Sequence, residues 1–400
     1  MSATATTHSH EPLRVDLSRP RERPSPQPKR QPTDRLRVAI VGLGERAAWM
    51  ASLIRKADTH VEVAAVVDPD PSKARERAGK ASLELTDSTA WFESIDALLD
   101  DDRPLDGIVI GTRCNLHTPL AVRLAKHSAA LFLEKPVAIS WSQYRELRAA
   151  MQHRTDDVVV SFPLRRTPLF EAAKHIVDSG RLGTLSQIQA FNNVPYGAVY
   201  VDTWYRDYDL DGGLWLQKAT HDFDYLHALA DSAPVAVMAM HSRQVWQAPV
   251  KHQDAGSAIL RYASGLHTSY VQNFIARRKA GARGATLIGE KATLTFDWYT
   301  NVIRVVEHEH DRVDEIKIDA DSAGHGGGDG RLAQNFVDVM RGRSASLTPI
   351  VDGLLSVATC LAARDSAATG QLTHIPTTGE PRPGVDRSAL RPDIEPPTDL

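Results

Sequence analysis

The chain has 400 residues, of which 42% are hydrophobic and 24% charged, and its formal net charge is −3. This length favours two domains, and the composition is that of a globular protein. The near-neutral charge excludes the broad basic surface that binds nucleic acid, and no apolar run is long enough to span a membrane. Cys114 and Cys360 lie far apart without metal-ligand spacing, so free thiols, no metal and a cytoplasmic location are expected.

Both ends of the chain are poor in apolar residues. Residues 1–34 are rich in Pro, Arg, Ser and Thr, and the end from 377 to 400 reads the same way. Such segments bury too little apolar surface to offset the chain entropy lost on folding, so both are predicted to be disordered tails. The first residues also lack the apolar stretch of a secretory signal.

Between residues 35 and 161, short β-branched segments alternate with helical patterns. The segments are RVAIVGL, VEVAAVV, GIVIGT, ALFLEK and DVVVS. This alternation is typical of crossover units, and it predicts a first domain built on a parallel sheet.

From residue 162 to 376 the pattern changes to longer segments. After a helix near 168–179, apolar and polar residues alternate in SQIQAFNNV, AVMAMHSRQVW, SAILRYA, LHTSYVQNF, ATLIGE, ATLTFDW and VIRVVEH. These segments predict a mostly antiparallel sheet with one wet or interface-forming face. Two helices follow, RLAQNFVDVMRGR and GLLSVATCLAARDSA, and the second is apolar on more than one side. It is therefore predicted to be buried or to pack back onto the first domain. The expected fold class is α/β.

The first predicted strand leads into a glycine turn and a helix, with the pattern G-x-G-x-x-A. The glycines permit a tight turn and close approach to a pyrophosphate, and the helix N-terminus offers unpaired N–H groups. The second strand ends in an acid that suits the ribose hydroxyls of NAD. Because Lys73 and Arg75 lie nearby in the sequence, NADP is not excluded as the cofactor. The predicted cofactor contacts here are Gly42, Leu43, Gly44, Glu45, Arg46, Ala47 and Asp68. The alternative is an ordinary strand-to-helix turn in which Asp68 caps the next helix.

Further landmarks follow in order along the chain. LFLEKPVAIS carries Glu134, Lys135 and Pro136 after a predicted strand, and GTRCNLHTPL places Asn115 and His117 before a helix. With FPLRRTPLF, GRLG and WYRDYDLDGG, this order resembles the glucose–fructose oxidoreductase, inositol dehydrogenase and MocA family of sugar dehydrogenases. The likeness covers about residues 36–372.

This resemblance implies a Rossmann domain followed by an α/β domain with a large, open, mostly antiparallel sheet. That sheet commonly forms the subunit interface, so a homodimer or homotetramer is expected. The resemblance also implies further cofactor contacts, at Thr112, Asn115, His117, Glu134 and Lys135.

The stretch GGLWLQKATHDFDYLHAL places Lys218, His221 and Asp222 at helical spacing, where side chains share one face. By resemblance His221 handles the proton of the reacting hydroxyl together with Lys135. Gln217 stands where many family members carry Asp, and it can hydrogen-bond a sugar hydroxyl but supplies no charge. Lys218 and Asp222 are candidates to position substrate, although an exposed ion pair on a wet helix face would look the same.

Four other residues are weaker candidates for substrate contacts. The glycine-rich stretch AGHGGGDG holds His325 and Asp329, which suit a loop at the cleft or an ordinary surface turn. Arg165 and Arg206 could contact a polyhydroxylated substrate or be structural. The metal-like segment EHEHD lacks a third fixed ligand and is interpreted as a solvated turn.

These expectations combine into an NAD-dependent dehydrogenase of a sugar, inositol or related polyol. Lys135 and His221 are the predicted catalytic residues, and Arg165, Gln217, Lys218, Asp222, His325 and Asp329 the predicted substrate contacts. One alternative is a glycosidase that oxidises its substrate transiently and regenerates NAD. The other is a non-catalytic dinucleotide sensor.

Overall fold

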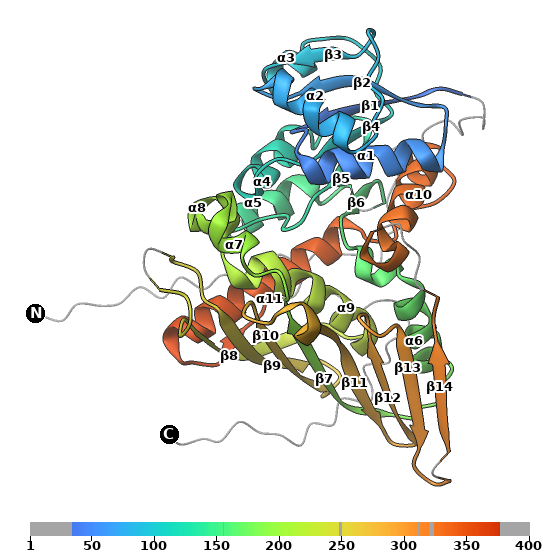
Figure 1. The fold of residues 1–400 in the computed structure, drawn as a ribbon, viewed down its shortest axis with the longest axis vertical. Helices are drawn as coiled ribbons and strands as arrows, with labels where there is room; N and C mark the ends of the chain where they lie inside the picture. Colours follow the sequence, from blue (N-terminus) through green and yellow to red (C-terminus); the bar gives the residue numbers. More distant parts are fainter. Residues whose placement is uncertain (1–33, 155, 248–249, 311, 320–323, 377–400) are drawn as a thin grey trace, which may run out of the picture.

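The computed structural model describes residues 34–154, 156–247, 250–310, 312–319 and 324–376 (Figure 1). The predicted disordered tails, 1–34 and 377–400, lie outside the described residues except for Asp34. None of the helices in the described segments is long and apolar enough to cross a bilayer.

The first sheet has six parallel strands in the order β3-β2-β1-β4-β5-β6. They are β1 (Leu36–Val41), β2 (Val61–Val67), β3 (Ala90–Phe92), β4 (Gly107–Ile110), β5 (Ala130–Leu133) and β6 (Val158–Val160). The connecting helices are α1 (Glu45–Ala57), α2 (Pro71–Lys80), α3 (Ile95–Leu99), α4 (Cys114–Arg123) and α5 (Trp141–Met151). The order reverses between β1 and β4, so the carboxyl ends of these strands open the crevice in which such sheets bind ligands. The predicted parallel sheet is confirmed.

The second sheet has nine strands in the order β14-β13-β12-β11-β7-β10-β9-β8-β15. Its strands are β7 (Leu185–Asn193), β8 (Pro234–Ser242), β9 (Ala255–Tyr262), β10 (His267–Asn273), β11 (Ala282–Gly289), β12 (Ala292–Asp297), β13 (Val302–Glu307), β14 (Val313–Lys317) and β15 (Thr373–His374). All its pairs are antiparallel except β7 with β10. The predicted mostly antiparallel sheet is confirmed.

Most of the remaining helical segments connect the two sheets or cover the second one, whereas α10 lies beside α1 of the first lobe (Figure 1). They are η1 (Pro163–Arg166), α6 (Pro168–Asp178), α7 (Val199–Asp202), η2 (Trp204–Arg206), α8 (Tyr208–Asp211), η3 (Trp215–Ala219), α9 (Thr220–Ala230), η4 (Arg278–Ala280), η5 (His325–Gly327), α10 (Gly328–Met340) and α11 (Ile350–Thr369). Of these, η3 is a π-helical turn that runs directly into α9. Such turns are frequent at functional sites.

The last two helices join the lobes. Helix α10 packs against α1 of the first lobe, and a Cβ on Gly107 of β4 would meet Met340 Sδ at 2.4 Å. Helix α11 is buried between β8 and α9 on one side and α5 and β6 on the other. The sequence predicted this buried position for α11, but the pattern did not indicate that α10 belongs to the core of the first lobe. The division of the chain at residues 161 and 162 stays a prediction.

Candidate functional site

The glycine turn after β1 forms a cradle at the reversal of strand order. Gly42 has φ +79°, and a Cβ there would lie 2.5 Å from Thr112 Cγ2, so only glycine fits. A Cβ on Gly44 would meet only Gly111 O, at 3.7 Å. Helix α1 starts at this turn without a side-chain cap. Free N–H groups at a helix N-terminus with open space before them fit a dinucleotide pyrophosphate.

Asp68 ends β2 beside this turn and is 7% exposed. Its carboxylate accepts hydrogen bonds from Leu43 N at 3.0 Å and Asp70 N at 2.9 Å. Asp68 therefore holds the glycine turn in place, and Asp70 rather than Asp68 caps α2. Lys73 and Arg75 are the basic residues near Asp68 that could favour NADP as the cofactor. Both contact other side chains of the protein. Lys73 pairs with Asp70 at 3.1 Å, and Arg75 lies 4.2 Å above the ring of Trp91.

Thr112 in the loop after β4, and Asn115 and His117 in the first turn of α4, lie at the carboxyl end of the parallel sheet. The imidazole of His117 lies between Pro136 O, 2.9 Å from Nδ1, and Thr112 O, 3.2 Å from Nε2. It therefore bridges the loops that follow β4 and β5. The buried Oδ1 of Asn115 has no hydrogen-bond partner among the described residues. Such an orphaned acceptor fits a donor from a bound cofactor.

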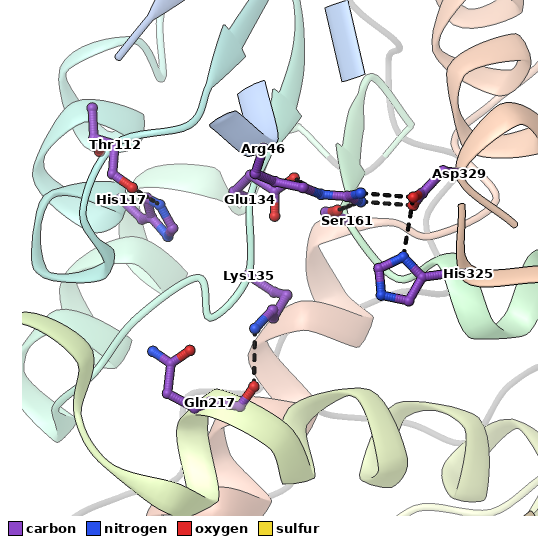
Figure 2. A network of polar contacts seen from close by, with 9 residues as sticks. All are labelled: Arg46, Thr112, His117, Glu134, Lys135, Ser161, Gln217, His325 and Asp329. Atoms are coloured by element: carbon purple, nitrogen blue, oxygen red, sulfur yellow. Dashed lines mark hydrogen bonds and ion pairs between the residues drawn. The ribbon is translucent and has the colours of Figure 1, made fainter. Parts of the chain in front are cut away.

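Arg46 links the glycine turn to the second half of the chain (Figure 2). Its guanidinium donates to Glu134 Oε1 at 3.0 Å, to Ser161 Oγ at 3.1 Å and to both carboxylate oxygens of Asp329 at 2.7 Å. Asp329 in turn contacts His325 Nδ1 at 3.0 Å. Since these partners occupy the Arg46 side chain, any contact of Arg46 with a cofactor would come from its backbone.

Lys135 follows β5 and points from the first lobe to the second (Figure 2). Its Nζ donates a hydrogen bond to Gln217 O at 2.9 Å. Burial, and next the neighbouring Lys218 ammonium, lower the pKa of Lys135 to about 8. A lysine with this pKa exchanges a proton near neutral pH, as a general base must.

His221 lies in the first turn of α9 and is 5% exposed. Burial, and then the positive charge of Lys135, lower its pKa well below the usual value, so the imidazole is neutral at neutral pH. Its buried Nδ1 has no hydrogen-bond partner among the described residues. The ring lies 5.9 Å from that of His325 and 6.1 Å from that of Phe162. The two predicted catalytic residues therefore lie within electrostatic range of each other.

Lys218 is buried, 7% exposed, and does not lie on a wet helix face. Its Nζ donates to Tyr196 Oη at 2.6 Å and lies 4.5 Å from the centre of the Tyr196 ring. Burial opposes its charge, but the phenols of Tyr200 and Tyr196 outweigh burial and raise the pKa of Lys218. The same ammonium lowers the pKa of Tyr196.

Asp222 is fully buried and points away from Lys218, so the exposed ion pair considered for these residues is absent. Its Oδ1 accepts from Arg283 Nε at 2.8 Å, and its Oδ2 accepts from Asn192 Nδ2 and Tyr270 Oη at 2.8 Å each. With both oxygens occupied, this carboxylate holds Arg283 in place, and its predicted contact with substrate stays a prediction.

Gln217 and Arg165 are also occupied by protein partners. The Gln217 amide donates to Cys114 Sγ at 3.2 Å and to Asp211 O at 3.0 Å, and the residue is 1% exposed. The Arg165 guanidinium pairs with Asp224 and Asp352, at 2.8 Å each. Both side chains join segments of the fold around the cleft. Their predicted contacts with substrate stay predictions.

Of the EHEHD segment, Glu307 ends β13 and residues 308–310 form a turn, while Asp311 lies outside the described residues. His308 contacts Thr293 Oγ1 at 2.9 Å, and His310 is exposed. In the segments that the structure describes, no group of three or more His, Cys, Asp or Glu side chains could hold a metal ion.

Two residues of the cleft were missed in the sequence. Arg283 could have been found, because alternation along β11 puts it on the buried face with Ala285 and Leu287. An arginine on the buried face of a strand needs a partner or a ligand. Tyr196 carries no such signal, since it lies in the irregular segment between β7 and α7.

Two family models match the two lobes in turn. The NAD-binding Rossmann fold of an oxidoreductase family matches residues 36–162, and the GFO/IDH/MocA C-terminal domain matches residues 170–295. Together the two matches cover more than half of the chain.

Curated relatives are more distant and are matched in part. The inositol 2-dehydrogenase of Rhizobium meliloti is 27% identical over 232 residues, and the scyllo-inositol 2-dehydrogenase (NAD(+)) of Bacillus subtilis is 23% identical over 208 residues. These matches cover 58% and 52% of this chain, but 66% and 57% of the relatives, which is less than two thirds of either.

Solved structures show the same fold. Levoglucosan dehydrogenase, solved in complex with NADH and levoglucosan, aligns with a TM-score of 0.76 at 19% identity, over 86% of this chain and 100% of that one. The sheet orders, the glycine cradle and the two matched lobes agree with this likeness. The chain belongs to the Gfo/Idh/MocA family of oxidoreductases and carries that family's NAD-binding Rossmann fold.

Proposed function

We propose that this chain is an NAD-dependent dehydrogenase that oxidises a hydroxyl-bearing carbon of a sugar, inositol or related polyol. The family relatives named above support this class of reaction. The fit of the glycine cradle supports the cofactor, and Asp68 with the engaged Lys73 and Arg75 favours NAD over NADP. The bound nicotinamide supplies the hydride acceptor.

The chain itself must hold the substrate carbon and move one proton. Lys135 reaches the cleft from the first lobe and His221 from the second. With a pKa of about 8, Lys135 takes the hydroxyl proton in its neutral form, while the neutral imidazole of His221 accepts a hydrogen bond or relays that proton. The main support is the Lys135 contact with Gln217 O, because it joins the lobes beside His221.

The roles of the surrounding residues follow from their partners. We infer that Arg46 and Asp329 orient His325 beside His221, and that Asp222 orients Arg283. His117, Thr112 and Asn115 shape the cofactor crevice. Of the predicted substrate contacts, Lys218 and His325 are the two that we propose to reach a substrate.

A panel of sugars and polyols, supplied with NAD or NADP in turn, tests the proposal. Stoichiometric formation of NADH that depends on one polyol class supports it. If sugar is released while NAD is regenerated and not consumed, the protein is the glycosidase of the first alternative and not a dehydrogenase. Binding of NADH without turnover of any compound would replace the proposal by the sensor alternative.

We further propose a homodimer or homotetramer formed through the second sheet, in the cytoplasm. The sheet face away from the helices exposes Met240, Ile259 and Val271, which are 70%, 56% and 46% exposed and share one face by their strand register. Apolar side chains gathered on an open sheet face are typical of an interface. The free thiols Cys114 and Cys360 agree with a reducing compartment.

A further inference from the structure

The cleft contains more positive charge than its own carboxylates balance. Lys135 and Lys218 form no ion pair with a carboxylate among the described residues, and Lys218 has a phenol as its partner. A phenol neutralises a lysine only by losing its proton. Buried charge without a counter-charge is costly, and proteins keep it where a ligand supplies the opposite charge.

The carboxylates around the cleft have other partners. Glu134 and Asp329 bind Arg46, and both oxygens of Asp222 are occupied. Asp211 contacts His252 Nε2 at 3.0 Å and the backbone N–H of Gly213 at 2.8 Å. None of these carboxylates therefore balances Lys218.

The Arg283 guanidinium supplies a further hydrogen-bond donor near Tyr196 and Lys218. Asp222 takes its Nε, but its buried Nη2 has no hydrogen-bond partner among the described residues. Residue 283 pairs with Asn192 at the end of β7, just before the segment that carries Tyr196. The positive charge of Arg283 adds to that of Lys218 in lowering the pKa of Tyr196, and it partly opposes the phenols that raise the pKa of Lys218.

The geometry points to an acidic sugar as the substrate, with its carboxylate bound by Lys218 and Arg283 Nη2. This inference rests on the proposed dehydrogenase function and names its substrate class. Asp222 already balances Arg283, so Lys218 leaves an excess of one charge, which a single carboxylate neutralises. Lys135 must be uncharged when it accepts the hydroxyl proton, so in the reacting complex it adds no charge that needs balancing. A phosphate dianion would carry more negative charge than the cleft balances.

The test compares matched pairs of acidic and neutral sugars with the full chain and NAD. D-glucuronate with D-glucose and D-galacturonate with D-galactose are suitable pairs, and D-glucose 6-phosphate tests the other anion. We expect kcat/KM to be at least about 10-fold higher for the acid of a pair, since a hydrogen-bonded charge pair contributes more than about 1.4 kcal/mol. Lys218→Met should reduce that ratio to near one, and Lys218→Arg should retain most of it.

The ratio of kcat/KM for the acidic sugar to kcat/KM for the neutral sugar is measured within each variant at one pH. A general loss of activity lowers both values equally and leaves the ratio unchanged. Lys126→Met, at an exposed position of the first lobe, is the matched control and should leave the ratio unchanged. A preference for the neutral sugar or the phosphate, or an unchanged ratio in Lys218→Met, would overturn the inference while the dehydrogenase function stands. If no sugar of either class forms NADH, the proposed function fails and this inference fails with it.

Discussion

The Lys135 ammonium donates a hydrogen bond to Gln217 O at 2.9 Å, across the boundary between the two lobes (Figure 2). The carbonyl belongs to the π-helical turn that leads into α9, and His221 lies in the first turn of that helix. This contact joins Lys135 to the helical segment that carries His221, 86 positions further along the sequence.

Removing the Lys135 amine should abolish turnover without removing the cofactor site. We expect Lys135→Ala to lower kcat by about 10²–10⁴-fold, the usual contribution of a general acid–base group. NADH affinity should change only a few-fold, because the glycine cradle is untouched. Steady-state kinetics and a fluorescence titration with NADH measure the two quantities. Wild-type turnover in this variant would remove Lys135 from the mechanism.

The rate of oxidation should depend on pH through Lys135. The neutral amine is the base, and its fraction rises with pH, so kcat/KM should increase about tenfold per pH unit below about pH 8 and level off above it. His221 should add no inflection between pH 6.5 and 8, because burial and then Lys135 keep its pKa well below 6.5. A flat profile from pH 6 to 9 would be incompatible with this assignment.

The inflection should move when Lys218 loses its charge. The Lys218 ammonium is the second cause, after burial, of the low Lys135 pKa. Lys218→Met should therefore raise the apparent pKa of the oxidation rate, whereas the control Lys126→Met should not. The comparison needs only pH–rate profiles with one turned-over sugar. A downward shift in Lys218→Met would show that the two lysines do not interact as described.

Gly42 should be irreplaceable in the cofactor turn. An alanine there combines φ +79° with a Cβ 2.5 Å from Thr112 Cγ2, so the turn must open. We expect Gly42→Ala to weaken NADH binding by about tenfold or more, because even about 1.4 kcal/mol of strain has this effect. Gly79→Ala in α2 is the control, since a Cβ there meets nothing within 4 Å and alanine favours a helix. Equal NADH affinities in the two variants would contradict the proposed cradle.

Asp329 should stabilise the fold through Arg46 and His325. Asp329→Asn removes a buried charge-assisted pair, and we expect the free energy of unfolding to fall by about 1–3 kcal/mol. The partly exposed pair of Asp338, on the same helix, with Arg343, beyond the end of that helix, should contribute below about 0.5 kcal/mol when tested as Asp338→Asn. Urea unfolding measures both values. If Asp329→Asn were no less stable than Asp338→Asn, the hydrogen bonds of Asp329 drawn in Figure 2 would not contribute to the free energy of unfolding.

Much of the fold was predictable because its signals are local. The β-branched segments of the first lobe and the alternating segments of the second became the expected strands, and the glycine turn preceded a helix as its pattern indicated. The short strands β3, β14 and β15 were missed. Strands β3 and β15 have only three and two residues, and β14 is mostly exposed, so none carries enough periodicity to distinguish a strand from a loop.

The sequence motifs indicated which residues to consider for the site, but they did not indicate the hydrogen-bond and ion-pair partners of those residues. Lys135 contacts the helical turn just before His221, and their joint catalytic role stays a prediction. Sequence spacing does not show where a buried side chain points. Asp222 and Asp329 face arginines that lie far away in the chain, Arg283 and Arg46. These pairings depend on how α10 and β11 pack, which is set by long-range contacts that a local pattern does not contain.

A crystal structure with NADH and a turned-over sugar tests the central claim most directly. The account predicts the reacting hydroxyl oxygen within about 2.6–3.2 Å of Lys135 Nζ and in hydrogen-bond reach of the His221 imidazole. The pyrophosphate should lie against the turn from Gly42 to Ala47. A hydroxyl out of reach of both side chains, or a dinucleotide bound elsewhere, would contradict the account.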